Sequence, residues 1–202
     1  LDHGEAGLLL KANEQLIVSA LSAQLDADTA NEALDEASRV SGLDPLTGLP
    51  NRTVLLDRFE LAIANAKRHG KRAALLFVDL DGFKQINDSF GHAAGDRALQ
   101  RVAACLSSLV RETDTVSRHG GDEFLYLLTE LHNENDIARI AKKIIHAIEV
   151  PIEVKLGDIR ITIRIGASIG IATYPKNGAT APVLINSADE AMYQAKQSQS
   201  GY

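Results

Sequence analysis

The sequence predicts a mixed α/β domain, with helices covering a central sheet, preceded by a long N-terminal helix. Three observations predict this class. Residues 1–43 carry apolar side chains at heptad spacing, which indicates a long helix. Residues 73–78 form a continuous apolar run typical of a buried strand, and residues 134–149 place apolar side chains on one helical face. Strands and helices therefore share one chain, as in sheets covered by helices.

The N-terminal segment, residues 1–43, predicts a parallel coiled coil that joins two chains. Over about five heptads, nine of the eleven a and d residues are apolar, and Asn13 at an a position suits a fixed register. The alternative is an amphipathic helix packed on its own domain, which apolar residues off the seam favour. The seam comprises Ala6, Leu9, Asn13, Leu16, Ala20, Ala23, Ala27, Ala30, Leu34, Ala37 and Ser41.

The next elements are a helix, a strand and a second helix. Residues 54–68 have helical spacing and end at Gly70, a typical C-cap. The apolar run at 73–78 then predicts a strand that ends at Asp79, and residues 96–110 predict an amphipathic helix.

A β-hairpin follows around Gly120 and Gly121. Residues 114–118 and 124–128 are β-prone and flank the glycine pair. Both central residues of a type I′ turn need positive φ, so the two glycines are expected to fill these positions. The C-terminal part predicts a helix at 134–149, a hairpin of strands 152–156 and 159–164 around Gly157-Asp158, a strand at 168–173 and a helix at 181–197.

Composition narrows the class of function. The chain of 202 residues carries a formal net charge of −6, which argues against nucleic acid as a partner because such binding needs clustered basic residues. A single cysteine, Cys105, excludes an internal disulfide. We therefore expect a cytoplasmic domain. Because the chain begins at Leu1 without a methionine, we read it as a fragment that lacks an upstream sensory domain; membrane attachment of the full-length protein is left open.

Two acidic clusters indicate a metal and phosphate site. One lies where the apolar strand reaches Asp79 and Asp81, and the other is the pair Asp122 and Glu123 beside the two glycines. If the clusters meet in space, their carboxylates form an oxygen-rich pocket suited to magnesium and a triphosphate.

Four runs of residues resemble the GGDEF domain of bacterial diguanylate cyclases. The resemblance covers residues 44–196, so we assign residues 44–202 to this domain. It implies a mixed five-stranded sheet like that of nucleotidyl cyclases and polymerase palm domains. The runs are DPLTGLPNR at 44–52, DLDGFKQINDSFGHAAGD at 79–96, RHGGDEF at 118–124 and ADEAMYQAK at 188–196.

The resemblance implies that two GTP molecules condense to cyclic di-GMP with release of two pyrophosphates. It also implies Mg²⁺ or Mn²⁺ bound by Asp79, Asp122, the backbone carbonyl of Leu80 and Glu123, with Asp122 as the proton acceptor. Strand alternation points Asp122 and Glu123 to opposite faces, which leaves ligation by Glu123 open. The alternative function is a non-catalytic receptor for GTP or cyclic di-GMP; the intact carboxylates favour the enzyme.

Further residues match the family's nucleotide-binding positions. Asn87 and Asp96 resemble the pair that reads guanine, since a carboxylate accepts from two guanine donors that adenine cannot offer together. The other expected substrate-binding residues are the phosphate-binding Lys84 and Lys196, the loop-supporting His92, and Gly120 and Gly121, whose backbone a phosphate can approach. After Lys196 this chain reads QSQS, where the family often has a glycine and a basic residue, which puts the affinity for triphosphate in doubt.

Arg111 and Asp114 match the family's RxxD inhibitory site, which implies feedback by cyclic di-GMP, with Lys142 or Lys143 assisting. A guanidinium can fork onto guanine O6 and N7 while a carboxylate accepts from the amino edge, so the pair suits a guanine-containing product.

Overall fold

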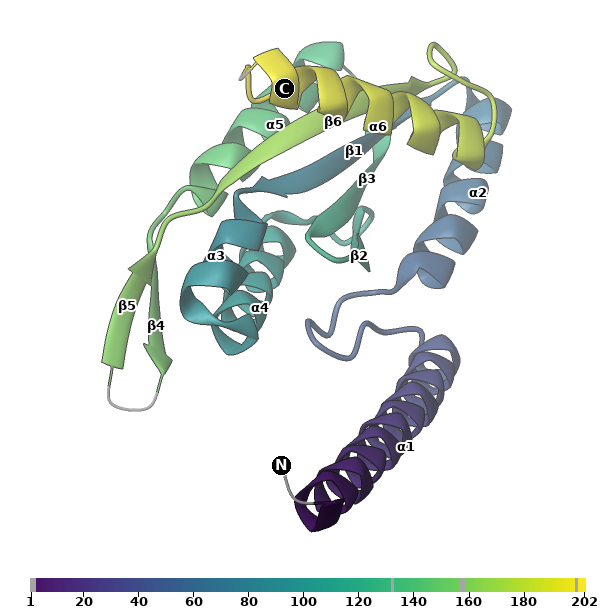
Figure 1. Cartoon of the computed structure of the whole chain (residues 1–202). Helices are drawn as coiled ribbons and strands as arrows, with labels where there is room; N and C mark the ends of the chain where they lie inside the picture. Colours follow the sequence, from purple (N-terminus) through teal and green to yellow (C-terminus); the bar gives the residue numbers. More distant parts are fainter. Residues whose placement is uncertain (1–2, 132, 157–158, 199) are drawn as a thin grey trace. The chain divides into compact units, whose positions relative to one another are not determined.

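The computed structural model describes residues 3–131, 133–156, 159–198 and 200–202. It divides into two units, Leu1–Ser41 and Gly42–Tyr202. The first is a helix and the second is an α/β domain (Figure 1). None of the described helices combines the length and the hydropathy that a membrane span requires.

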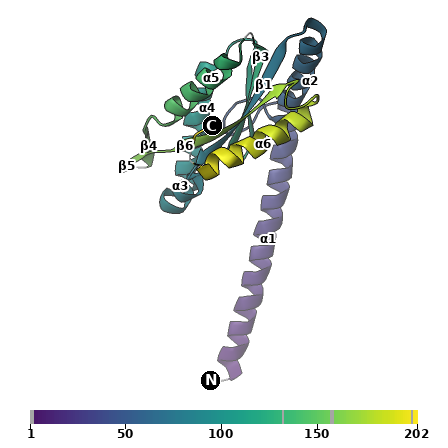
Figure 2. The same ribbon diagram turned by 90° about the horizontal axis from the view of Figure 1, so that it is seen from above.

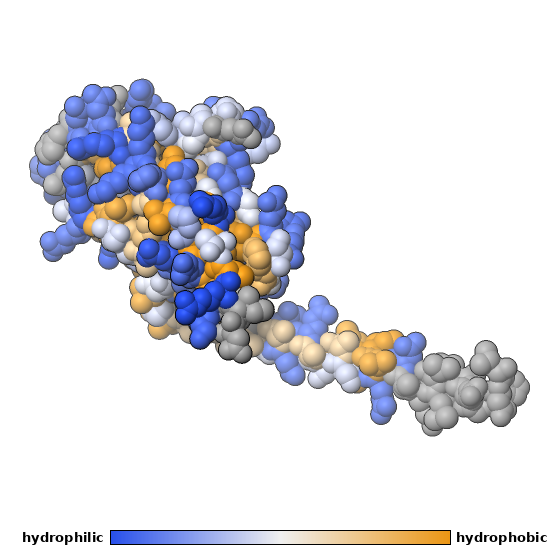
Figure 3. All heavy atoms as spheres, turned by 90° about the vertical axis from the view of Figure 1, so that its left-hand side faces the viewer, coloured by the Kyte–Doolittle hydropathy of each residue, from blue (hydrophilic) through white to orange (hydrophobic). Residues whose placement is uncertain are grey.

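Helix α1 (His3–Ser41) runs without interruption for 39 residues. Among its described side chains, Leu16, Ile17 and Leu21 are large, apolar and exposed, and Figure 3 shows apolar side chains gathered on its surface. Exposed apolar stripes mark surfaces for association. Pairing with a second chain stays a prediction; residues 1 and 2 and the side chains of Ala6 and Leu9 lie outside the described part of the helix.

The central sheet is antiparallel throughout and has the order β2-β3-β1-β6 in the part of the chain that the structure describes. The expectation of a mixed five-stranded sheet was therefore wrong. The strands β4 (Ile152–Leu156) and β5 (Ile159–Ile163) do not join this sheet. They form a separate two-stranded sheet, in which β4 packs on the helix at His92–Leu109. The predicted turn at 157–158 lies outside the described residues. The four strands are β1 (Arg72–Asp81), β2 (Thr115–Gly120), β3 (Glu123–Leu131) and β6 (Gly166–Tyr174).

Helices cover both faces of the central sheet (Figure 2). On one face lie α2 (Arg52–His69) and α6 (Ala181–Ser198), and on the other lie α4 (His92–Leu109) and α5 (Glu134–Ile148). The period of two along β1 explains this arrangement, because alternate side chains point to opposite faces. All four helices were predicted, although α4 begins four residues before the expected start.

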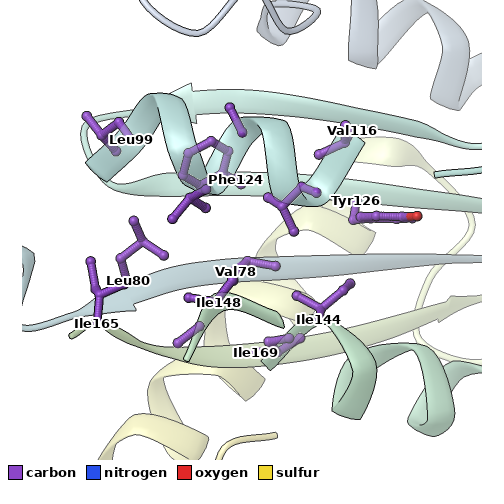
Figure 4. Packing of buried hydrophobic residues seen from close by; sticks show 14 of the residues in the cluster. Val78, Leu80, Leu99, Val116, Phe124, Tyr126, Ile144, Ile148, Ile165 and Ile169 are labelled. Carbon is purple, nitrogen blue, oxygen red and sulfur yellow. The ribbon is translucent and has the colours of Figure 1, made fainter. Parts of the chain in front are cut away.

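The two cores lie on opposite sides of β1. Leu75 and Phe77 belong to the core beneath α2 and α6, whereas Leu76 and Val78 belong to the core beneath α4 and α5. Figure 4 shows Val78 and Phe124 of the sheet packed among side chains of the covering helices. A strand buried on both faces must be apolar at every position, which is why residues 73–78 form an uninterrupted apolar run.

The predicted end of α2 is confirmed, and its start has a matching cap. Gly70 adopts the left-handed conformation, with φ of 62°, and its N–H donates to the Ala66 carbonyl. The Asn51 side chain accepts from the Val54 N–H at 3.1 Å. One short helix, α3 (Phe83–Phe90), was not predicted. Its apolar residues Phe83, Ile86 and Phe90 do follow helical spacing, but eight residues are fewer than the window over which such spacing is read.

Candidate functional site

The two acidic clusters meet at one end of the sheet. Asp79 on β1 stands directly opposite Glu123, the first residue of β3, in the antiparallel register. Residues directly opposite in such a pair project to the same face. Glu123 therefore lies beside Asp79 rather than away from it. Asp79 is only 9% exposed and lies inside β1, which continues to Asp81.

Contrary to our expectation, the two glycines do not occupy the two central positions of the turn. Gly120 pairs with Glu123, so Gly121 and Asp122 occupy the turn. Gly120 has φ of 152° and follows a register shift after Arg118, while Gly121 has φ of 50°. The first glycine thus forms an irregularity in β2, and Asp122 sits at the tip of the hairpin.

Arg118 holds this turn in place. Its Nε and Nη2 donate to the Gly121 carbonyl at 3.0 and 2.8 Å, and its Nη1 forms an ion pair with Asp44 Oδ2 at 3.2 Å. On the other side, the Leu80 N–H donates to the Asp122 carbonyl at 3.3 Å. The turn is therefore tied to both β1 and the segment before α2.

Asp44 was not among the predicted site residues. Besides binding Arg118, its Oδ1 accepts from the N–H and the hydroxyl of Thr47, at 2.8 and 2.5 Å. The signal that could have found it is its place at the start of the DPLTGLPNR run. Its role in the structure is to orient Arg118 and, through Arg118, the acidic turn.

Lys196 reaches the acidic cluster from α6. Its Nζ donates to Asp79 Oδ1. Partial burial lowers the pKa of Lys196, but the hydrogen bond and charge of Asp79 outweigh this and leave the pKa raised. The lysine is thus firmly cationic, and its side chain, 43% exposed, is open to a ligand.

The carboxylates in this cluster disfavour one another's charge. Burial raises the pKa of Asp122, and the negative charge of Asp79 raises it further. Burial also raises the pKa of Glu123, followed by the charges of Asp79, Asp189 and Asp122. A cation bound among these oxygens would relieve both effects.

The donor set fits a magnesium-like ion that is shared with a substrate. Within the residues that the structure describes, no group of three or more His, Cys, Asp or Glu side chains is arranged to hold a metal alone. Mg²⁺ is usually bound by one or two carboxylates together with water and substrate phosphates. The adjacent carboxylates of Asp79 and Glu123, with Asp122 at the neighbouring turn, provide that kind of set.

The residues expected to contact guanine lie on α3 and α4, which pack together. The Oδ1 of Asn87 is buried and accepts no hydrogen bond from any described residue. Lys84, His92 and Asp96 are exposed. Lys84, His92 and Asp96 are therefore available to a ligand, whereas Asn87 Oδ1 is closed off from solvent.

His119 is a second residue that was not predicted. Its Nδ1 is buried and has no hydrogen-bond partner among the described residues. Its ring packs edge to face against that of Phe77, with the ring centroids 5.6 Å apart. Burial lowers the pKa of His119; Arg52 adds to this, and Asp189 opposes it. A neutral imidazole therefore lies just before the glycine turn.

Arg111 and Asp114 lie at a different place, in a hollow of about 200 Å³ between β3 and α5. Asp114 is 7% exposed, its Oδ1 accepts from the Thr129 N–H at 3.0 Å, and burial raises its pKa. Lys143 lines this hollow together with Arg139, which was not predicted. Lys142 instead points over the ring of Tyr202, 5.9 Å from its centroid.

Comparison with known proteins identifies relatives of the α/β unit. The family model "Diguanylate cyclase, GGDEF domain" matches residues 41–201. The bifunctional diguanylate cyclase/cyclic di-GMP phosphodiesterase MucR of Pseudomonas aeruginosa is 45% identical over 194 residues, which cover 93% of this chain and 28% of MucR. Diguanylate cyclase TpbB of the same species is 43% identical over 158 residues, covering 78% of this chain and 36% of TpbB. The chain thus spans about a third of the length of these relatives.

Solved structures agree with these matches. A structure comprising only the GGDEF domain of TpbB has a TM-score of 0.73 at 43% identity, covering 77% of this chain and 89% of that one. The GGDEF domain of DgcB from Caulobacter crescentus, crystallised with c-di-GMP, has a TM-score of 0.72 at 26% identity and covers 79% of this chain and 89% of its own.

Proposed function

Since the chain belongs to the diguanylate cyclase GGDEF domain family, we propose that it condenses two molecules of GTP into cyclic di-GMP and releases two pyrophosphates. One observation carries the proposal most directly. Asp79, Glu123 and the turn that bears Asp122 come together at one end of the sheet, with Lys196 hydrogen-bonded to Asp79. Oxygen ligands and a cation at one place suit phosphoryl chemistry.

The carboxylates are the proposed metal ligands. Asp79, Asp122, Glu123 and the backbone carbonyl of Leu80 would hold Mg²⁺ or Mn²⁺, which, when bound, assists loss of the hydroxyl proton and neutralises charge on the leaving pyrophosphate. Asp122 is the proposed acceptor of the proton from the attacking 3′-hydroxyl, a role that competes with metal ligation for the same carboxylate oxygens.

The surrounding residues bind and orient the nucleotide. Lys196, and Lys84 from α3, would neutralise the triphosphate, while the exposed backbone at Gly120 and Gly121 leaves room for a phosphate beside the turn. Asn87 and Asp96 would read the guanine base, and His92, at the start of α4, would support that loop.

Two chains are needed for the reaction, because each domain offers one GTP site and two nucleotides must react with each other. We assign the pairing of the two chains to residues 1–43, whose exposed apolar residues suit a coiled coil. Residues 44–202 form the proposed catalytic domain. The product would bind again at Arg111 and Asp114 and inhibit the enzyme. In the longer protein, an upstream sensory domain would act through the N-terminal helix on a cytoplasmic catalytic domain.

The test is product formation by charge-removing variants. Asp122→Asn and Asp79→Asn should each reduce the rate of cyclic di-GMP formation at least about a hundredfold, the scale of losing one charge-stabilising group. Both should fold, because Asp122 lies in a turn and asparagine is nearly isosteric with aspartate. Asp57→Asn is the matched control, since it removes one exposed carboxylate from α2 and should retain full activity. Near-normal turnover by either folded site variant would contradict the assignment.

A further inference from the structure

Gly95 occupies a position where glycine is unfavourable on grounds of local structure. It is buried inside helix α4 and does not have the positive φ that favours glycine. Alanine is the better residue in a helix interior. The backbone of α4 therefore does not require a glycine here, and the reason must lie in what surrounds the position.

The neighbour that a side chain would meet is Asn87. A Cβ atom at residue 95 would lie 2.0 Å from Asn87 Oδ1 and 3.0 Å from its Cγ. The next contact, with Phe83 Cζ at 3.2 Å, needs a shift of only a few tenths of an ångström. Because the terminal O and N of a carboxamide are similar in size, the clash exists whichever way the amide is oriented.

The Asn87 side chain is packed against α4, although the residue as a whole stays partly exposed. Its Oδ1 is buried against Gly95 and has no hydrogen-bond partner among the described residues, so the position of the carboxamide depends on the space at residue 95. Gly95 is followed directly by Asp96, the other residue proposed to read guanine. The same turn of α4 therefore accommodates one base-reading side chain and carries the other.

We propose that Gly95 is a positioning residue for guanine recognition, which acts by leaving the space that the Asn87 carboxamide occupies against α4. This inference rests on the proposed use of GTP. Alanine at this position displaces the carboxamide by at least about 1 Å, and misplacement on that scale costs up to about a hundredfold in a preorganised site. Gly95→Ala is therefore expected to weaken GTP binding by about tenfold to a hundredfold and to reduce the preference for GTP over ATP.

A double-mutant cycle tests this route of action. The affinities of a non-hydrolysable GTP analogue and of the matching ATP analogue are measured for the wild type, Gly95→Ala, Asn87→Ala and the double variant. Because Asn87→Ala removes the carboxamide that residue 95 would displace, Gly95→Ala is expected to cost less than about twofold in that background. Mn²⁺ binding without nucleotide, followed by electron paramagnetic resonance, should be the same in all four proteins.

The outcomes separate the inference from the function on which it rests. Failure of the wild type to bind the GTP analogue overturns the proposed function. Two results overturn the positioning role alone when the wild type does bind the GTP analogue. Either Gly95→Ala leaves the affinity unchanged, or it lowers the affinity by the same factor with Asn87 present and with Asn87→Ala. If Gly95→Ala fails to fold, the same comparison is made by thermal unfolding. Recovery of folding in the double variant supports the inference, and an equally unfolded double variant overturns it.

Discussion

Gly170→Ala should destabilise the domain, because helix α6 lies directly on β6 at this residue. A Cβ atom at position 170 would lie 1.8 Å from the Ala188 carbonyl oxygen and 2.2 Å from the Met192 nitrogen. Both are backbone atoms of α6, so no rotation of a side chain can relieve the contact. The helix itself must move away from the sheet.

The expected loss follows from the scale of overpacking in protein cores. Forcing extra atoms into a packed interior typically costs about 1–3 kcal/mol and occasionally more, and contacts with fixed backbone place this substitution at or above the upper end. For a domain of this size, each kcal/mol lowers the melting temperature by about 2–4 °C. We therefore expect a melting temperature about 6–12 °C below that of the wild type. Because α6 carries Lys196 to Asp79, affinity for GTP should fall as well.

Gly178→Ala is the matched control for this experiment. Its Cβ would meet Val183 Cγ1 at 2.7 Å, and that methyl group can move by rotation of the valine side chain. Thermal unfolding followed by circular dichroism should therefore show a much smaller loss for Gly178→Ala than for Gly170→Ala. Equal melting temperatures for Gly170→Ala and the wild type would refute the close packing of α6 on β6.

Three other perturbations probe assembly, feedback and pH. Deleting residues 1–40 should reduce specific activity steeply at low protein concentration, and concentrating the truncated protein should restore it; specific activity independent of concentration would argue against pairing through the N-terminal helix. Arg111→Ala should relieve inhibition by added cyclic di-GMP and retain turnover at low product concentration. Unchanged inhibition would show that Arg111 is a solvated surface cation that does not bind the product. Because burial lowers the pKa of His119, the folded protein binds fewer protons than the unfolded chain, and stability should fall as pH drops through about 6.5. Melting temperatures between about pH 7.5 and 5.5 should fall less for His119→Leu than for the wild type; identical slopes would count against a buried neutral imidazole.

The sequence predicted those elements whose signals are local. The uninterrupted apolar run before Asp79, the apolar face of α5 and the C-cap at Gly70 each depend on neighbouring residues, and each is present in the structure. Helix α3 was missed although Phe83, Ile86 and Phe90 have helical spacing, because its eight residues are fewer than the window over which a period is read. The fifth strand was expected from the resemblance alone, and the 152–163 hairpin instead forms its own sheet.

The contacts that build the site are long-range and could not be predicted residue by residue. Lys196 and Asp79 are separated by 117 positions, and Arg118 and Asp44 by 74. The motifs indicated which residues to examine, but only the fold shows that Arg118 binds the turn and Asp44. The pairing of Glu123 with Asp79 likewise depends on the β1–β3 register, which simple alternation along one strand cannot supply.

The most direct test of the central claim is the stoichiometry of the reaction. Purified protein is incubated with GTP and Mg²⁺, and cyclic dinucleotide and pyrophosphate are both quantified by chromatography and a coupled pyrophosphate assay. A diguanylate cyclase releases two pyrophosphates for each cyclic di-GMP formed, and we expect this ratio together with loss of both products in Asp122→Asn. GTP binding without either product would contradict it and indicate a non-catalytic nucleotide receptor.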